Sequence, residues 1–116
     1  MNNRELGTFY EDVAARYLKA RNYQIVVRNY RCRMGEIDLI GWDGDCLVFI
    51  EVKYRTTYHQ GGAFMAVNPK KQHRISMVAA FYLLDHQLSE ETCCRFDVVA
   101  IDGTKISLIK NAFDYC

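Results

Sequence analysis

The sequence lacks a hydrophobic run that could span a membrane. Its longest uncharged, strongly apolar stretch is ISMVAAFYLL at residues 75–84, about half of what a membrane-crossing helix needs. The amino terminus is charged from Arg4 onward, unlike a secretory signal. We therefore expect a soluble, cytoplasmic protein with no membrane partner.

The cysteines lack a recognisable pattern. They are odd in number and include no C-x-x-C pair, standing at Cys32, Cys46, Cys93, Cys94 and Cys116. An odd set argues against a complete disulfide framework, and the missing pair argues against a structural zinc site. We expect reduced thiols.

Repeats, linkers and low-complexity segments are also missing. The chain has 116 residues, of which 50% are hydrophobic, which is enough for one domain with an ordinary core. We therefore expect a single domain over residues 1–116.

Acidic residues are absent from two long stretches. Residues 13–35 carry six basic side chains and no acid, and residues 52–84 carry five basic side chains and no acid. The segment between them, residues 36–51, holds five acids and no base. An acidic segment framed by basic ones suits a site that holds a divalent cation and grips a polyanion. A solvated charge mosaic is the alternative.

Apolar periodicity and turn residues predict two helices and two β-hairpins. A first helix is expected from Glu5 to about Ala20 and a second from Asn68-Pro69, as cap and first position, to about His86. The expected strands are an edge strand at 24–30, a hairpin at 36–54 with its turn at 43–45, and a last hairpin that begins at 95–101 and turns at 102–103. Residues 55–67 have no clear period and contain Gly61-Gly62, so we expect a mobile loop.

The first hairpin sets the position of three charged side chains. With a two-residue turn, Asp38 shares a face with Glu51 and Lys53, whereas a slip of one residue would reverse that face. The apolar pattern supports the first register, since it gathers Ile37, Leu39, Val48, Ile50 and Val52 on the opposite face.

The first helix offers another carboxylate. Gly7, Glu11, Ala15 and Leu18 recur along one side of it, so Glu11 stands among small and apolar neighbours. A glycine inside a helix costs up to about 1 kcal/mol relative to alanine, which is easier to accept if something approaches closely beside Glu11. An edge glutamate that reaches water is the alternative.

Asp38, Glu51 and Lys53 match the needs of phosphodiester hydrolysis. Two carboxylates on adjacent strands can hold Mg²⁺, or Mn²⁺ in its place, and Glu11 can add a third ligand. Lys53 can orient or deprotonate a water, or neutralise developing charge. An exposed cross-strand ion pair, worth about 0 to 1 kcal/mol, is the structural alternative.

Several polar side chains are candidates for binding a nucleic acid. Three precede the hairpin (Asn29, Arg31, Arg33), and three crowd the start of the second helix (Lys70, Lys71, Arg74), where backbone N–H groups also favour anions. Arg55 follows Lys53 in the same basic stretch. A solvated surface is the alternative. Asp97 is either a remote acid of the site or a partner in a structural ion pair.

The second helix carries two apolar stripes. Ile75, Val78, Ala79, Tyr82 and Leu83 form one, and Met77, Phe81 and Leu84 form another on a different side. A helix that is apolar on two sides is either sandwiched or exposes an interface, so we expect a homodimer.

Six motifs carry a family resemblance. They are GTFYEDVAARYL at 7–18, VVRNYRCRMGEIDLI at 26–40, VFIEVKYR at 48–55, K-x-x-x-I at 71–75, RFDVVAI at 95–101 and NAF at 111–113. With these, the chain resembles nearly end to end the YraN-like family of small bacterial proteins, which look like distant relatives of archaeal Holliday-junction resolvases in the PD-(D/E)XK nuclease superfamily.

The resemblance implies an α/β, restriction-endonuclease-like fold with a mixed β-sheet flanked by α-helices. It puts Asp38, Glu51 and Lys53 at the positions of the catalytic triplet and Glu11 at that of the helix-borne acid. The sequence departs from the pattern because Ile37, not proline, precedes Asp38, and because GGAFMAV replaces an acidic residue expected near 63–66. The expected function is Mg²⁺-dependent cleavage of structured or branched DNA. The alternative is a noncatalytic nucleic-acid-binding or interaction module that retains the fold.

Overall fold

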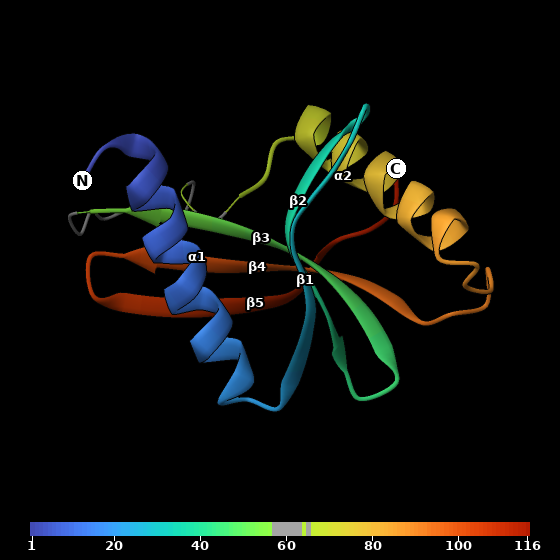
Figure 1. Cartoon of the computed structure of the whole chain (residues 1–116), viewed down its shortest axis with the longest axis horizontal. Coiled ribbons are helices and arrows are strands. Elements are labelled where there is room, and N and C mark those ends of the chain that lie inside the picture. The colour runs from blue at the N-terminus through green and yellow to red at the C-terminus, as the bar shows by residue number, and fades with distance from the viewer. Residues whose placement is uncertain (57–63, 65) are drawn as a thin grey trace.

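The computed structural model of the chain describes residues 1–56, 64 and 66–116 as a mixed sheet with a helix on each side (Figure 1). The helices are α1 (Asn3–Lys19) and α2 (Pro69–Asp85). The strands are β1 (Tyr23–Cys32), β2 (Gly35–Asp43), β3 (Cys46–Arg55), β4 (Cys94–Asp102) and β5 (Lys105–Phe113). This is the expected α/β fold of a mixed β-sheet flanked by α-helices, and it is consistent with a restriction-endonuclease-like fold.

The five strands of the described sheet lie in chain order, from β1 at one edge to β5 at the other. β3 and β4 are parallel and are connected through α2, and the other neighbours are antiparallel. A crossover helix between parallel strands begins near the carboxyl end of the first strand. The fold therefore brings the start of α2 toward the end of β3 that carries Glu51 and Lys53.

Both helix starts follow from their capping residues. Asn2 caps α1 and accepts a hydrogen bond from the Glu5 backbone N–H, while the Glu5 side chain accepts from Asn2 in return. Asn68 caps α2 by accepting from the Lys71 backbone N–H, with Pro69 at the first position as predicted. Of the loop predicted at 55–67, residues 57–63 and 65 lie outside the described residues.

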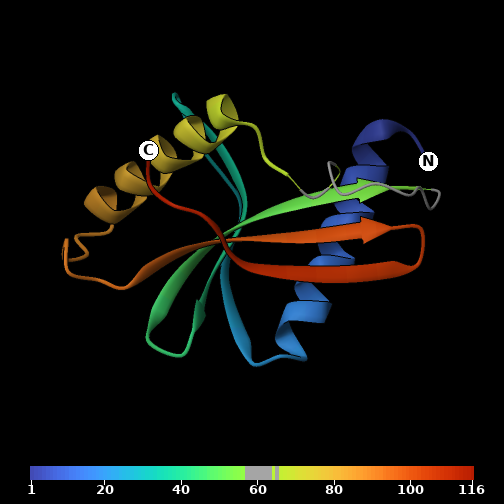
Figure 2. The same cartoon turned by 180° about the vertical axis from the view of Figure 1, so that it is seen from behind.

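The core has two parts, one under each helix. Alternate residues of β3 supply them, with Val48 and Ile50 facing α1 and Leu47 and Phe49 facing α2. Because helices cover both faces, β3 reads as a continuous apolar run. From behind, Figure 2 shows β3, β4 and β5 crossing in front of α1, and α2 standing over the other part of the sheet.

The predicted apolar face is wrong for Ile37, which packs with the α2 cluster and not with Leu39. The β2–β3 pairing begins at Leu39–Ile50. Beyond this pair, the Val52 N–H of β3 donates to the Asp38 carboxylate at 2.8 Å instead of to a backbone carbonyl of β2. β2 thus leaves the β3 ladder at Asp38, and this departure breaks the alternation that the sequence pattern assumes.

The expectation of reduced thiols is wrong for Cys46 and Cys93, which form a disulfide with Cα atoms 4.7 Å apart. Cys46 opens β3 and Cys93 immediately precedes β4, where the Leu47 N–H donates to the Cys93 carbonyl at 2.8 Å. The pair is 47 residues apart in sequence, and it forms because the parallel strands start side by side. Cys32, Cys94 and Cys116 are free thiols.

Both edges of the sheet are irregular. β1 is the edge strand that the sequence predicts, and its pairing with β2 shifts between Ile25 and Val27. The pairing of β5 with β4 shifts between Phe96 and Val98. An asparagine with positive φ interrupts each edge strand, Asn29 at 54° and Asn111 at 53°.

Neither of the two described helices combines the length and the hydrophobicity that a membrane crossing demands.

Candidate functional site

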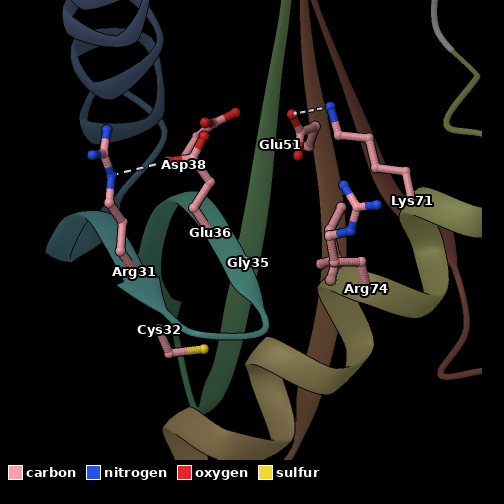
Figure 3. A pocket seen from close by; sticks show the side chains of 9 residues that line it. Arg31, Cys32, Gly35, Glu36, Asp38, Glu51, Lys71 and Arg74 are labelled. Carbon is pink, nitrogen blue, oxygen red and sulfur yellow. Dashed lines mark ion pairs between the residues drawn. The ribbon is translucent and has the colours of Figure 1, made fainter.

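A cleft of about 470 Å³ opens where β2, β3 and the start of α2 meet. Asp38 and Glu51 contribute its carboxylates from neighbouring strands, and Lys71 and Arg74 reach it from α2 (Figure 3). Arg31 and Glu36 close the other side and form an ion pair at 3.0 Å. The structure therefore brings together acidic and basic side chains from Arg31 to Arg74, which are 43 positions apart in the sequence.

The hairpin register that places Asp38 next to Glu51 is the predicted one. The turn has two residues between Asp43 and Cys46, and the pairing continues to Leu39–Ile50. One position further along, Asp38 is no longer paired with β3 through its backbone, but its carboxylate stays beside Glu51 and accepts the Val52 N–H. The Glu51 carboxyl, when protonated, donates a hydrogen bond to Asp38. The two carboxyl groups thus meet directly in the cleft.

Burial and mutual repulsion make this carboxyl pair hard to ionise fully. Burial, followed by the Asp38 charge, raises the pKa of Glu51 from 4.5 to about 8, against the opposing effect of Lys71. Burial also raises the pKa of Asp38, opposed by the Val52 N–H bond. Near neutral pH the pair therefore holds a proton, which a bound cation can replace.

Glu11 stands in a neighbouring hollow of about 320 Å³, lined by residues from α1, β1 and β2 that include Gly7, Asn29, Arg31 and Glu36. Burial and then the Asp38 charge raise the pKa of Glu11, whereas a hydrogen bond with the Asn29 side chain lowers it. Its Oε1 atom is buried and has no hydrogen-bond partner among the described residues. A buried carboxylate oxygen without a partner, in a hollow next to the cleft, is suited to accept a hydrogen bond from a water or a ligand.

Tyr54 lies beside Gly7, and a Cβ on Gly7 would lie 3.7 Å from the Tyr54 hydroxyl oxygen. This is an ordinary van der Waals distance, so the described residues do not make the close approach that the sequence suggested beside Glu11. α1 packs onto the end of β3 at this point without requiring a glycine.

Lys53 lies apart from the carboxyl pair. Its ammonium donates to the Ala66 carbonyl and stands 5.6 Å from the Phe64 ring centre. The described residues that line the cleft do not include Lys53. Burial, with a contribution from the nearby Lys71 charge, lowers its pKa.

Lys71 takes the place beside the carboxylates that the sequence suggested for Lys53. Its Nζ atom lies 3.0 Å from Glu51 Oε1. Sequence reasoning proposed Lys71 only as a nucleic-acid contact. The signal that could have placed it is the crossover itself, because a helix linking parallel strands starts near the end of β3.

The seven predicted nucleic-acid contacts fall into three groups. Arg31, Lys71 and Arg74 line the cleft, and Asn29 lines the hollow beside it. Arg33, in the turn between β1 and β2, and Lys70, in the first turn of α2, are exposed. Arg55 lines neither space, since it stacks 3.8 Å from the Phe64 ring centre and lies 4.0 Å from Asp102.

Gly35, the first residue of β2, allows the Arg74 side chain to lie across the start of that strand. Its φ of 146° is one that residues with a Cβ rarely adopt, and a Cβ there would meet the Arg74 side chain at 3.0 Å. The glycine therefore shapes the wall of the cleft.

The donor set fits Mg²⁺ as a two-carboxylate site. Among residues 1–56, 64 and 66–116, no three His, Cys, Asp or Glu side chains are grouped closely enough to hold a metal by themselves. Mg²⁺ keeps several waters and is commonly bound through one or two carboxylates and substrate phosphates. Asp38 and Glu51 meet that lower requirement.

Asp97 is structural. It is 1% exposed, and it accepts hydrogen bonds from the Tyr23 hydroxyl at 2.8 Å, from Arg95 at 2.8 Å and from the Asn111 N–H at 3.0 Å. Arg95 also joins it to Asp43. This buried cluster ties β1, β2, β4 and β5 together and matches the ion-pair alternative.

Comparison with known proteins places the chain among close relatives. The family profile described as "Uncharacterised protein family UPF0102" matches residues 10–101. A UPF0102 protein of Lachnoclostridium phytofermentans is 50% identical over 98% of this chain and 97% of its own length. A UPF0102 protein of Aeromonas hydrophila is 48% identical over 92% of this chain and 83% of its own length. A UPF0102 protein of Syntrophus aciditrophicus is 47% identical over 97% of this chain and 91% of its own length. The chain therefore belongs to the UPF0102 family, the YraN-like family that its motifs resemble.

Proposed function

We propose that this protein is a Mg²⁺-dependent endonuclease that hydrolyses phosphodiester bonds in structured or branched DNA. The observation that carries the proposal is the buried Asp38–Glu51 pair in a cleft whose other charged side chains include Arg31, Lys71 and Arg74. Ionising both carboxyl groups of this pair is costly unless a cation is bound. Strongly perturbed pKa values in a cleft are also a mark of functional sites. The resemblance to PD-(D/E)XK nucleases supports the same assignment.

Asp38 and Glu51 would hold the metal. Glu11, which is not grouped with them closely enough to be a direct third ligand, would contribute through a water. When bound, Mg²⁺ supplies charge stabilisation to phosphoryl oxygens and lowers the pKa of a coordinated water. The basic side chains of the cleft would bind the phosphates that flank the scissile bond. Once it leaves the Ala66 carbonyl, Lys53 would orient the attacking water as an ammonium or take its proton as a neutral amine.

A cleavage assay tests the proposal. The protein is incubated with supercoiled, linear and four-way-junction DNA, with Mg²⁺ or Mn²⁺, alongside Glu51→Gln and Lys53→Ala. We expect cleavage by the wild type and a loss on the order of a hundredfold or more in both variants. Glu36→Gln is the matched control, because it removes an exposed carboxylate from the same cleft and should retain cleavage. Binding without cleavage in every lane would refute the enzyme assignment.

A noncatalytic nucleic-acid-binding module is the second candidate. It is favoured by one observation, that Lys71 and Lys53 are both already engaged, Lys71 with Glu51 and Lys53 with the Ala66 carbonyl. This candidate predicts junction binding that weakens in Arg74→Ala but is unaffected by Asp38→Asn, with no metal-dependent product.

We also propose a homodimer formed through α2. Its second stripe is exposed, with Met77 at 41%, Phe81 at 37% and Leu84 at 78%, while the irregular sheet edges are poor surfaces for adding a strand. Sedimentation of the wild type and of Phe81→Asp tests this, since the variant should be monomeric at concentrations where the wild type is dimeric. A wild type that stays monomeric throughout would refute it.

A further inference from the structure

The ion pair between Lys71 and Glu51 joins an accessible cation to a buried anion. The Lys71 side chain is 48% exposed, whereas the Glu51 side chain is 10% exposed. Figure 3 shows the Lys71 chain extending from α2 to end on Glu51, with Arg74 below it on the same helix. The ammonium therefore sits between the carboxyl pair and the solvent.

Glu51 cannot serve Lys71 and a divalent cation equally well. An ammonium 3.0 Å from Glu51 Oε1 neutralises the charge that would attract a metal, and it repels a cation placed beside it. Lys71 thus stabilises the metal-free protein and opposes metal binding at the same oxygen.

Lys71 is also placed to leave Glu51 for an anion. It lies in the first turn of α2 between Lys70 and Arg74, a region where basic side chains and the helix terminus together favour phosphate. A lysine has a flexible stem and a point charge, so it can exchange partners without a fixed fork geometry.

We propose that Lys71 is an exchangeable counter-ion, which offsets the negative charge of the Asp38–Glu51 pair in the free protein and transfers to a backbone phosphate when DNA binds. The inference rests on the proposed function and adds a regulatory step to it. Release of Glu51 by DNA raises the affinity of the Asp38–Glu51 pair for a divalent cation. By linkage, the cation raises the affinity for DNA by the same factor. The site is thereby kept from binding metal tightly until a substrate is present.

Titration calorimetry with Mn²⁺ on the protein alone tests the first half. It is done above about pH 8, where Glu51 is largely ionised, on the wild type, Lys71→Met and Lys70→Met, with Asp38→Asn to identify the site. We expect Lys71→Met to bind Mn²⁺ about fivefold more tightly, the factor for an ion pair worth about 1 kcal/mol. Lys70→Met removes the same charge one residue away without the Glu51 contact and should bind Mn²⁺ like the wild type.

Fluorescence anisotropy with a labelled four-way junction tests the second half, in a Lys53→Ala background that prevents cleavage. At constant ionic strength, the tightening of junction binding by Mn²⁺ should be about fivefold larger when Lys71 is present than in Lys71→Met, where only direct contact between metal and phosphate remains. Lys70→Met should bind the junction more weakly and keep the gain.

Two failures are distinguishable. Mn²⁺ binding that depends on Asp38 but is equal in the wild type and Lys71→Met, or an Mn²⁺ gain in junction affinity that is undiminished in Lys71→Met, would overturn the exchange while leaving the proposed function intact. Absence of Asp38-dependent Mn²⁺ binding would overturn both. Thermal unfolding of each variant confirms that the comparison is between folded proteins.

Discussion

Replacing Glu51 with glutamine should stabilise the metal-free protein at high pH. The folded-state pKa of Glu51 is raised from 4.5 to about 8, by burial first and Asp38 second. Between these values the folded chain binds a proton that the unfolded chain has released, so the free energy of unfolding falls as pH rises. The stabilising effect of this group is complete below pH 4.5 and is lost as pH passes about 8. Glutamine is neutral throughout and removes that loss.

The magnitude follows from the same pKa. A tenfold change in proton affinity corresponds to about 1.4 kcal/mol, so ionising Glu51 in the folded state costs on the order of 5 kcal/mol. The attraction of Lys71 is already contained in the pKa of about 8, so it is not subtracted again. We expect Glu51→Gln to raise the free energy of unfolding by up to about 5 kcal/mol well above pH 8, or the midpoint by on the order of 20 °C.

Thermal and urea unfolding in chelator-containing buffers would measure this from below pH 4.5 to above about pH 8. Glu36→Gln serves as the control, because its side chain is 56% exposed and its effect should stay within about 0.5 kcal/mol. A stability difference between Glu51→Gln and the wild type that is constant across this range would refute the reasoning. So would a variant that is less stable at high pH.

Other positions allow simpler tests. Cys46→Ser should lower the free energy of unfolding by about 4 kcal/mol from loop-closure entropy, and reductant should bring the wild type to the same midpoint; a wild type insensitive to reductant would contradict the disulfide. Gly35→Ala should cost about 1 to 3 kcal/mol because of its positive φ and should weaken DNA binding by displacing Arg74, so unchanged stability would count against that strain. Tyr23→Phe should cost about 1 to 3 kcal/mol in urea unfolding because it removes a donor from buried Asp97; a loss below about 0.5 kcal/mol would show that the hydroxyl is replaceable.

Local sequence signals were sufficient for the secondary structure and for half of the candidate site. The turn after Asp43 and the alternation along β3 determine the register, and the register alone brings Asp38 to Glu51. Asn68-Pro69 marks the start of α2 because capping depends on neighbours in sequence. These features involve residues whose partners lie within one hairpin or one helical turn.

The remaining features depend on tertiary packing. Lys71 reaches Glu51, and Lys53 reaches the Ala66 carbonyl, only once α2 is docked against the end of β3. The partners of long, flexible side chains cannot be predicted from the periodicity of the sequence. The Cys46–Cys93 pair depends on two parallel strands starting side by side, with no spacing signature. Ile37 lies on the α2 side of the sheet because β2 separates from β3 at Asp38. A prediction that assumes regular alternation along the strand cannot anticipate this separation.

The irregular edges of the sheet have a consequence for the behaviour of the chain at high concentration. A flat, open edge strand is a template for the growth of intermolecular sheets. Here, pairing shifts border both edges, and Asn29 and Asn111 twist the backbone of β1 and β5 out of register with any added strand. Self-association along the hydrogen-bonding direction is thus disfavoured, so fibrillar aggregation should require loss of an edge strand from the native sheet and not simple crowding of folded molecules.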